Sequence, residues 1–554
     1  MIPGTGSWIR KWAEVRPNRT VWVSEGRRYS YAEANQRVNQ VASVLIDSGV
    51  TAGDRVAVLL YNGNELLEIF FACAKIGAIF VPINFRLASP EAVFVLEDCG
   101  AHVLFYDAEL RTTVEAMQAG VLGLRAIKVG AGAAGGIDLA AQPGAGREDY
   151  EAREDYEALI AGAQSDEPAG EVTLDDYQLI MYTSGTTGRP KGAVISHGNT
   201  YFNSVNGHLA YPILSTDITY VVAPLFHMGA LNIFTTPTIQ AGGTVLLGRS
   251  FDAKATLEMI EQYRVTTMFG PPTMFQMMLE APNWVNADLS SLRFLFAGGA
   301  PCPLNLIEAY STRGVALAQG FGLTETSPFV TLLPMEDAVR KLGSVGLPVF
   351  HSDVCVAGDD GRHLGEGERG ELLTRGPHVF QGYWNNPEAT DAAFADGWFR
   401  TGDIGYRDDE GYYYLVDRKK DMVISGGENI YPAELERILE DHPAISDVAV
   451  VGVPEKKWGE VPLAIVVRRS GADVDADALI DFLRPRIASY KLPRSVVFLD
   501  ELPRSATGKV LKPALREQFA DLFGKVVPEQ DAGGDEARDG CNVGSAPVEP
   551  GGTI

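Results

Sequence analysis

The stretch TSGTTGRPKG, residues 183–192, determines how we interpret the rest of the chain. It follows the apolar run LIMY at residues 179–182, and therefore begins where a strand is expected to end. Its glycines allow the backbone to approach an anion closely, while its hydroxyl groups, Arg189 and Lys191 supply hydrogen-bond donors and positive charge. The stretch predicts a loop that binds a polyphosphate. It is not the usual P-loop, because the residue after Lys191 is glycine rather than Ser or Thr. The alternative to a phosphate-binding loop is a plain Gly/Thr surface turn.

Length and composition limit the classes of protein that the chain can belong to. Its 554 residues are too many for one hydrophobic core, so we expect two or more domains. The hydrophobic fraction of 46% and the charged fraction of 21% are typical of a globular protein. A formal net charge of −25 argues against nucleic acid or an anionic membrane as the main partner. Local cations must then bind any phosphate-bearing ligand.

Cysteine usage and the apolar segments indicate a cytoplasmic protein. The cysteines are odd in number and lack metal-type spacing, which favours reduced thiols; they are Cys73, Cys99, Cys302, Cys355 and Cys541. Residues 1–20 lack the continuous apolar core of a signal peptide. The segment 66–85 is interrupted by Glu68, Lys75 and Pro82, so we expect a buried helix followed by a strand and no transmembrane span.

Strand-like and helix-like segments alternate through the first four hundred residues. Apolar runs at 55–60, 79–83 and 103–106 enclose helical patterns at 65–75 and 90–98. This alternation predicts βαβ units, and hence an α/β fold with a large N-terminal domain of βαβ-type sheets flanked by helices. Further apolar runs open into glycine-rich turns, which place backbone amides at strand ends; these runs are 220–223, 243–247, 265–269, 292–296 and 315–318.

The chain beyond residue 419 has a different pattern. A charged cluster, RKKD at 418–421, lies between two apolar runs and suggests a connector. After it we expect a small α+β domain with helices at 433–441 and 476–488 and strands at 448–453, 463–467 and 496–499. The predicted boundaries are 1–419, 420–525 and an acidic, disordered tail at 526–554. The tandem REDYEA at 147–158 is a local duplication in an exposed loop.

Five motifs in a fixed order resemble those of the adenylate-forming superfamily, which includes acyl-CoA synthetases, peptide-synthetase adenylation domains and beetle luciferases. They are TSGTTGRPKG, FGLTET (321–326), WFRTGDIG (398–405), DRKKDMVISGGENIYP (417–432) and PRSATGKVLK (503–512). The resemblance spans residues 8–523 and implies a large adenylation domain with a small, mobile α+β C-terminal domain. It also implies ATP and Mg²⁺ as cofactors and coenzyme A as co-substrate.

The resemblance assigns most of the ATP site. Phosphate binding is assigned to the first loop, residues Thr183, Ser184, Gly185, Thr186, Thr187, Gly188 and Lys191. Adenine lies near Gly299, Ala300 and Pro301 and near Gln319, Gly320 and Phe321. Thr324 binds the α-phosphate, Glu325 with Thr183 binds Mg²⁺, and Asp403 with Arg418 holds the ribose. Outside these motifs, Glu325 would be a solvated loop carboxylate and Asp403 a turn residue.

The resemblance divides two reaction steps between two faces of the small domain. Lys509 matches the catalytic lysine that bridges the attacking carboxylate and the α-phosphate, although a solvent-exposed lysine is the alternative. Lys420 matches the hinge about which the domain swings. The resemblance assigns coenzyme A binding to Ser425, Gly426, Gly427 and Trp458, and a packed surface tryptophan is the alternative for Trp458.

The acid to be activated is hydrophobic. In peptide-synthetase domains of the superfamily that the chain resembles, an Asp shortly after the corresponding Phe pairs with the substrate amino group. Here His227, Met228 and Gly229 follow Phe226, so the ammonium of an α-amino acid would be buried without a partner. His227 matches the residue that borders the carboxylate, where a structural His is the alternative; the other expected pocket residues are Met228, Met274, Phe275, Gly298, Gly320 and Pro328.

The resemblance is nearest to bacterial synthetases for medium- to long-chain fatty acids. An aryl or alicyclic acid, loading of a carrier protein, luciferase-like oxidation and a nucleotide-binding scaffold stay open. The sequence specifies neither the chain length of the acid nor the oligomeric state, and a homodimer also stays open.

Overall fold

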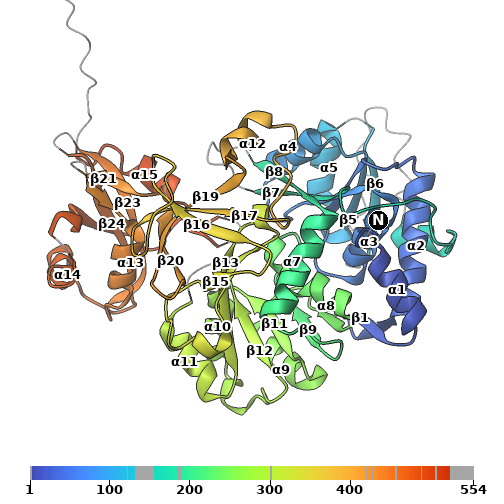
Figure 1. The fold of residues 1–554 in the computed structure, drawn as a ribbon, viewed down its shortest axis with the longest axis horizontal. Coiled ribbons are helices and arrows are strands. Elements are labelled where there is room, and N and C mark those ends of the chain that lie inside the picture. The colour runs from blue at the N-terminus through green and yellow to red at the C-terminus, as the bar shows by residue number, and fades with distance from the viewer. Residues whose placement is uncertain are drawn as a thin grey trace, which may run out of the picture. The chain divides into compact units, whose positions relative to one another are not determined.

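The computed structural model describes residues 3–121, 123–130, 155–183, 190–299, 302–418, 421–425, 428–455, 458–487, 489–505 and 508–523. The chain divides into two compact units, residues 1–420 and 421–554 (Figure 1). This division lies one residue after the boundary expected between 419 and 420. The expected tail at 526–554 and residues 147–154 of the duplicated segment lie outside the described residues.

The first sheet of the larger unit carries the phosphate-loop motif at one edge. Its strand order is β6-β5-β3-β4-β7-β8, and its strands are β3 (Arg55–Leu59), β4 (Ile79–Pro82), β5 (Val103–Asp107), β6 (Arg125–Val129), β7 (Tyr177–Thr183) and β8 (Lys191–Ser196). Neighbouring strands are parallel except β7 and β8, which form an antiparallel hairpin. Its helices are α2 (Tyr31–Asp47), α3 (Asn64–Ile76), α4 (Ser89–Cys99), α5 (Arg111–Gly120) and α6 (Tyr156–Ala161).

The second sheet has the order β15-β14-β13-β12-β11-β9-β10-β1-β2. Its strands are β1 (Thr20–Ser24), β2 (Arg27–Ser30), β9 (Ile218–Val221), β10 (Thr244–Leu247), β11 (Thr267–Gly270), β12 (Phe294–Ala297), β13 (Ala316–Gly322), β14 (Phe329–Leu332) and β15 (Leu347–Pro348). Its helices are α1 (Ser7–Val15), α7 (His197–Ala210), η2 (Ala230–Thr235), α8 (Thr236–Ala241), α9 (Ala253–Tyr263), α10 (Pro272–Leu279) and α11 (Leu304–Thr312). The α/β alternation expected from the sequence is confirmed in both sheets.

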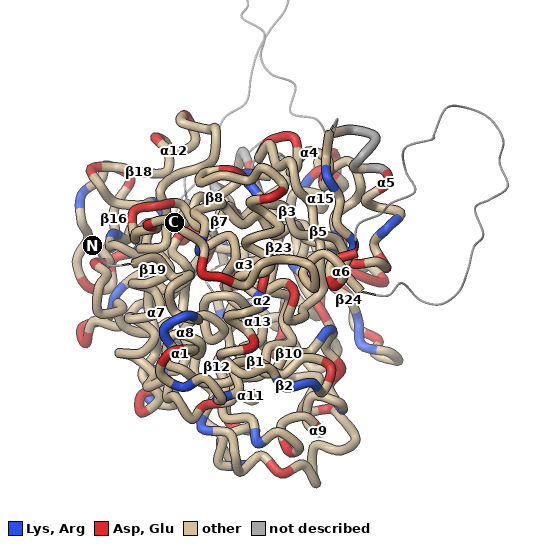
Figure 2. Tube along the Cα trace, turned by 90° about the vertical axis from the view of Figure 1, so that its right-hand side faces the viewer, with Lys and Arg blue, Asp and Glu red and all other residues tan. Residues whose placement is uncertain are grey.

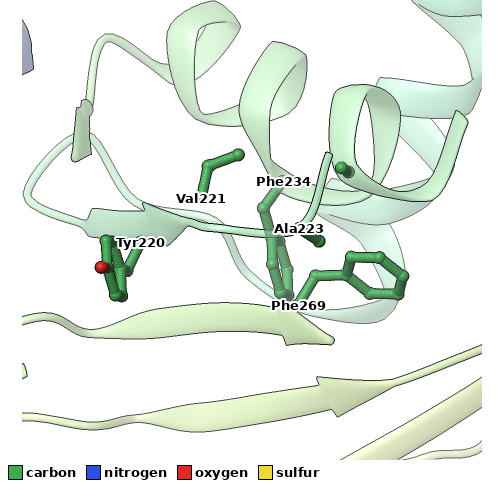
Figure 3. A pocket seen from close by; sticks show the side chains of 6 residues that line it. Tyr220, Val221, Ala223, Phe234 and Phe269 are labelled. Atoms are coloured by element: carbon green, nitrogen blue, oxygen red, sulfur yellow. The ribbon is translucent and has the colours of Figure 1, made fainter. Parts of the chain in front are cut away.

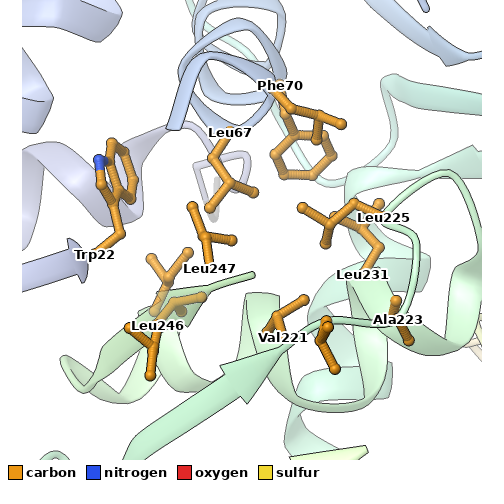
Figure 4. Packing of buried hydrophobic residues seen from close by; sticks show 14 of the residues in the cluster. Trp22, Leu67, Phe70, Val221, Ala223, Leu225, Leu231, Leu246 and Leu247 are labelled. Carbon is orange, nitrogen blue, oxygen red and sulfur yellow. The ribbon is translucent and has the colours of Figure 1, made fainter. Parts of the chain in front are cut away.

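The main core fills the space between these two sheets. Helix α3 is buried from Leu66 to Lys75, as its nearly continuous apolar sequence requires. Figure 4 shows Leu67 and Phe70 of this helix pointing toward Leu225 and Leu247 of the second sheet region. The segment 66–85 is therefore the buried helix α3 and the strand β4, as predicted. Among the described residues, no helix is both long and apolar enough to cross a bilayer.

A third, antiparallel sheet completes the larger unit. Its strands are β16 (Asp353–Ala357), β17 (Gly370–Arg375), β18 (Phe394–Ala395), β19 (Trp398–Arg407) and β20 (Tyr413–Arg418), and helix α12 (Pro387–Ala393) precedes β18. Figure 2 shows acidic and basic residues interspersed along the described chain. This agrees with binding by local cations.

The smaller unit is an α+β domain. Its strands are β21 (Val423–Ser425), β22 (Glu428–Ile430), β23 (Ile445–Glu455), β24 (Gly459–Arg468) and β25 (Ser495–Phe498), and its helices are α13 (Pro432–Glu440), α14 (Ala476–Leu483) and α15 (Lys512–Gln518). The helix predicted at 476–488 was too long. It ends at Leu483 because Pro485, two residues later, has no N–H with which to continue the helical ladder.

Candidate functional site

The β7–β8 hairpin brings the two described ends of the phosphate-loop motif together. Thr183 and Lys191 are cross-strand partners, and the Thr183 hydroxyl lies 3.5 Å from the Lys191 carbonyl oxygen. The Lys191 ammonium lies 5.1 Å from the centre of the Tyr383 ring. The other predicted phosphate-binding residues, 184–188, lie outside the described residues.

Glu325 lies in a short 3₁₀ helix, η4 (Thr324–Thr326), directly after β13. Its side chain is buried, and its Oε1 accepts a hydrogen bond of 2.9 Å from the Tyr383 hydroxyl. Its backbone carbonyl accepts a 2.8 Å hydrogen bond from Phe380 N–H. Thr324, at the start of η4, is half-buried. Because η4 packs against β8, the expected metal-binding carboxylate is adjacent to the phosphate-loop hairpin.

The turn that carries Glu325 requires a close backbone approach. A Cβ atom added at Gly322 would lie 1.5 Å from the Pro328 carbonyl oxygen, so any larger residue would displace this turn. The Thr326 hydroxyl donates a hydrogen bond of 2.7 Å to the Pro328 carbonyl oxygen and accepts one of 2.9 Å from Leu323 N–H. These bonds fix η4 between β13 and β14.

The predicted adenine segments lie at neighbouring strand ends. Gly299 follows β12 with a φ of +83°, a conformation that favours glycine, and Ala300 and Pro301 lie outside the described residues. The side-chain amide of Gln319 donates 2.9 Å to the Ser344 carbonyl, and Phe321 packs in a small core with Val330 and neighbouring side chains. Gln319 therefore supports the strand, and its side-chain N–H already has a protein partner.

The predicted ribose-binding pair lies on two adjacent strands. Asp403 of β19 and Arg418 of β20 are directly opposite each other in the antiparallel ladder. Asp403 is 5% exposed, and its N–H donates 3.1 Å to the Thr401 hydroxyl. These two residues, 15 positions apart in sequence, are thus backbone partners in the third sheet.

His227 lies in the loop between β9 and η2. Its ring centre is 4.4 Å from that of Phe226, which contacts Phe85 at 5.0 Å. A small cavity opens beside this loop; its lining residues are Tyr220, Val221, Ala223, Ala230, Phe234 and Phe269 (Figure 3). Figure 3 shows Phe234 and Phe269 close together at one side of the cavity.

The other predicted pocket residues are distributed around this region. Met228 is buried and lies 3.2 Å, sulfur to nitrogen, from the Asn232 amide. Met274 and Phe275 follow β11 on α10, and the Phe275 ring packs 5.9 Å from that of Tyr310 in the main core. Pro328 follows a cis peptide bond after Ser327. None of these side chains lines the cavity, and three of its six lining residues are aromatic residues that were not predicted to belong to the pocket.

In the smaller unit, the residues assigned to coenzyme A lie side by side. Ser425 pairs with Gly459, the residue after Trp458, and Trp458 is 46% exposed. Gly426 and Gly427 lie outside the described residues, in the two-residue connection between β21 and β22. The structure therefore brings together the described members of this predicted set.

Lys509 is presented on a tight turn of the same unit. Ser505 N–H donates 2.7 Å to the Lys509 carbonyl, Lys509 N–H donates 3.2 Å to the Ser505 hydroxyl, and the Lys509 side chain is exposed. The Arg504 guanidinium donates to the Gly508 carbonyl at 2.7 Å and pairs with Asp447. These bonds connect the described residues on both sides of positions 506 and 507. The predicted hinge, Lys420, lies outside the described residues.

Sequence analysis missed two features of this site. Tyr383 contacts both Lys191 and Glu325, yet it lies between the recognised motifs, and its only sequence signal is the GYW at 382–384. Phe269 was noted only as the end of a strand. Both depend on contacts between segments that are remote in sequence.

The profile of the AMP-binding enzyme family matches residues 9–384, and that of the AMP-binding enzyme C-terminal domain matches residues 434–509. The chain belongs to the AMP-binding enzyme family. A feruloyl-CoA synthase of Amycolatopsis sp. is 45% identical over 516 residues, which cover 93% of this chain and 99% of the relative. An indoleacetate–CoA ligase of Aromatoleum aromaticum is 42% identical, covering 93% of this chain and 98% of the relative.

Solved structures agree with this assignment. A Mycobacterium tuberculosis fatty acyl CoA synthetase matches with a TM-score of 0.75 and 37% identity, covering 94% of this chain and 99% of that one. The o-succinylbenzoate CoA synthetase of Bacillus subtilis in complex with ATP and magnesium ion matches with a TM-score of 0.80 and 33% identity, covering 92% of this chain and 99% of that one. This AMP-binding enzyme is an ATP-dependent acyl-CoA ligase that uses ATP, Mg²⁺ and coenzyme A.

The residues present suit Mg²⁺. Glu325 and Thr183 offer carboxylate and hydroxyl oxygens, the ligands that a hard cation prefers. Among the described residues, no group of three or more His, Cys, Asp or Glu side chains could form a cage for a metal ion.

Proposed function

We propose that this ligase activates an aryl-substituted carboxylic acid, the alternative to the medium- or long-chain fatty acid that the sequence motifs suggested. The observation that carries the proposal is a block of phenylalanine rings beside Gly229, two residues after His227. A Cβ atom added at Gly229 would lie 2.7 Å from the Phe269 ring, and one added at Gly298 would lie 3.1 Å from it. These two glycines thus leave space that Phe269 fills.

The aromatic block continues behind Gly320. A Cβ atom added there would lie 3.1 Å from the Phe296 ring, whose centre is 6.4 Å from that of Phe269 and 5.9 Å from that of Phe329. Phe234 joins the same cluster, 6.2 Å from Phe296. Rings at such separations attract one another by about 0.5–1.5 kcal/mol per pair beyond simple burial. A flat aryl group can pack against this wall, whereas an extended alkyl chain would have to displace it.

The named relatives support the same choice. The feruloyl-CoA synthase and the indoleacetate–CoA ligase are named for acids that carry an aromatic ring, and both are more similar in sequence to this chain than the fatty acyl CoA synthetase structure is. The fatty acid is the second candidate, because that structure matches over 94% of this chain.

The proposed roles of the chain's residues follow the chemistry of adenylation. A carboxylate oxygen of the acid attacks the α-phosphorus, the bond to the bridging oxygen breaks, and pyrophosphate leaves. Bound Mg²⁺ would neutralise charge on the phosphates. Lys191 binds the phosphates, Thr324 holds the α-phosphate, and Lys509 stabilises the negative charge where carboxylate and phosphate meet.

The second step uses the other face of the small unit. The coenzyme A thiol, having lost its proton, attacks the acyl carbon, the bond from that carbon to the AMP oxygen breaks, and AMP leaves. Ser425 and Trp458 are the residues proposed to contact the pantetheine arm, and His227 is proposed to border the acyl carboxyl group. The proposed hinge at Lys420 allows one small unit to serve both steps.

A competition assay tests the proposed substrate class. Purified protein with ATP, Mg²⁺ and coenzyme A receives an equimolar pool of arylpropenoic, arylacetic and benzoic acids together with fatty acids of short to long chain. The acyl-CoA products are identified by mass. Aryl-CoA products are expected to dominate, whereas dominance of fatty acyl-CoA would reject the aryl proposal in favour of the second candidate.

A further inference from the structure

Tyr383 lies between the residues proposed to bind the phosphates and the metal. Its hydroxyl donates to Oε1 of Glu325 at 2.9 Å, and its ring centre is 5.1 Å from the ammonium of Lys191. Nothing in the roles above involves this residue. It is the described side chain that touches both charged groups at once.

The backbone around Tyr383 is tied to both partners. Tyr383 forms an antiparallel bridge with Ala193 of β8, and the next residue, Trp384, donates its N–H to the Gly192 carbonyl at 2.7 Å. Phe380 N–H donates to the Glu325 carbonyl at 2.8 Å. Segment 380–384 therefore holds the phosphate-loop hairpin and η4 in one arrangement, and the Tyr383 side chain is placed by that arrangement.

The two contacts of Tyr383 act on opposite charges. Burial, followed by the negative charge of Glu325, raises the pKa of the Tyr383 hydroxyl, so it stays protonated and donates. A hydrogen bond to one carboxylate oxygen fixes the orientation of the carboxylate while the second oxygen is directed elsewhere. The ring face attracts the Lys191 ammonium without neutralising it, as a carboxylate partner would do.

We propose that Tyr383 is a positioning residue that orients Glu325 toward the metal and Lys191 toward the phosphates before MgATP binds. The inference rests on the proposed roles of Glu325 and Lys191, but not on the proposed aryl substrate. A phenol in this position lets a cation and an anion stand close to each other without collapsing into an ion pair. Each of them is then available to its own part of MgATP.

Two substitutions separate the two contacts. Tyr383→Phe keeps the ring beside Lys191 and removes the hydroxyl, whereas Tyr383→Leu removes both. The matched control is Tyr156→Phe, because the Tyr156 hydroxyl also donates to a buried carboxylate, Glu68, at 2.6 Å, in the same unit and away from the site. Each variant is compared with the wild-type protein by its thermal unfolding midpoint and its activity.

The first readout is the Mg²⁺ dependence of pyrophosphate release. In Tyr383→Phe, the Mg²⁺ concentration at half-maximal rate is expected to rise about tenfold, as expected when one hydrogen bond to a charged group is lost. KM for ATP at saturating Mg²⁺ is expected to change less than about twofold, because the ring beside Lys191 remains. In Tyr383→Leu both quantities are expected to rise, and Tyr156→Phe should match the wild type in both.

The second readout is calorimetric binding of ATP at several Mg²⁺ concentrations, which requires neither the acid nor turnover. If no acid is converted, the substrate proposal fails while this measurement still decides the role of Tyr383. A Tyr383→Phe protein that binds MgATP with the wild-type Mg²⁺ dependence would overturn the inference. An equal shift in Tyr156→Phe would also overturn it, because general loosening of the unit would then explain the effect.

Discussion

Replacing Phe269 by alanine tests the aromatic wall that we propose closes the acid pocket. The ring lies beside Gly229 and Gly298 and lines the cavity together with Phe234, so its removal enlarges that cavity. The space freed accepts about four methylene groups, each of which gains roughly 0.8 kcal/mol when buried. The sum of about 3 kcal/mol predicts that kcat/KM for a medium-chain fatty acid, relative to an aryl acid, rises about a hundredfold.

The assay is a comparison of kcat/KM for one aryl acid and one medium-chain fatty acid in the wild type and in Phe269→Ala, with acyl-CoA measured directly. Phe202→Ala is the matched control. Phe202 is a half-buried residue of α7 whose ring centre lies 5.6 Å from that of His351, and it does not line the cavity. Both variants lose packing and stability, but only Phe269→Ala should change the ratio. A ratio that stays at the wild-type value in Phe269→Ala would refute the wall as the determinant of substrate class.

Three further predictions concern other parts of the chain. Lys509→Ala is expected to abolish acyl-adenylate formation but to convert supplied acyl-adenylate to acyl-CoA; full forward activity would contradict the role of the lysine. The Arg516–Asp421 contact of 2.7 Å joins α15 to the residue after the proposed hinge. Arg516→Gln should lower the free energy of unfolding of the small unit by about 1–3 kcal/mol. Urea unfolding of Arg516→Gln, Asp421→Asn and the double variant should show that the two effects are coupled. Additive effects would contradict a stabilising contact between Arg516 and Asp421. Burial raises the pKa of Glu65 to about 7; the negative charges of Glu68 and Glu157 raise it further, and Arg37 lowers it. Between pH 4.5 and 7 the folded protein therefore keeps a proton on Glu65 that the unfolded chain loses. The free energy of unfolding falls as the pH rises through this window. Glu65→Gln should raise the unfolding temperature at pH 8 and leave it nearly unchanged at pH 4; equal effects at both pH values would exclude this cause.

The sequence predicted the elements whose local pattern and tertiary role agree. Segment 66–85 became α3 and β4, and the runs at 55–60 and 103–106 became β3 and β5, because continuous apolar sequence between turn residues leaves few other structures. In the small domain, strands expected at 448–453 and 463–467 extend to Ile445–Glu455 and Gly459–Arg468. Cross-strand pairing between β23 and β24 extends both strands into polar residues, which the hydrophobic periodicity does not predict.

The site could be predicted only where motifs carry it. Asp403 and Arg418 were paired by resemblance, and the structure places them opposite each other in one ladder. The Tyr383–Glu325 bond joins residues 58 positions apart, and the approach of Phe269 to Gly229 depends on how η2 packs over β11. Neither contact leaves a local signature, since each depends on the positions of separate elements.

The central claim is that the acid is activated as an acyl-adenylate, and oxygen labelling tests it most directly. The preferred acid, labelled with ¹⁸O in its carboxyl group, is converted with ATP, Mg²⁺ and coenzyme A, and AMP is then analysed by mass. Because the carboxylate oxygen that attacks the α-phosphorus stays with AMP when the thiol displaces it, each AMP should carry one ¹⁸O. Unlabelled AMP, or ADP with labelled inorganic phosphate, would contradict this account.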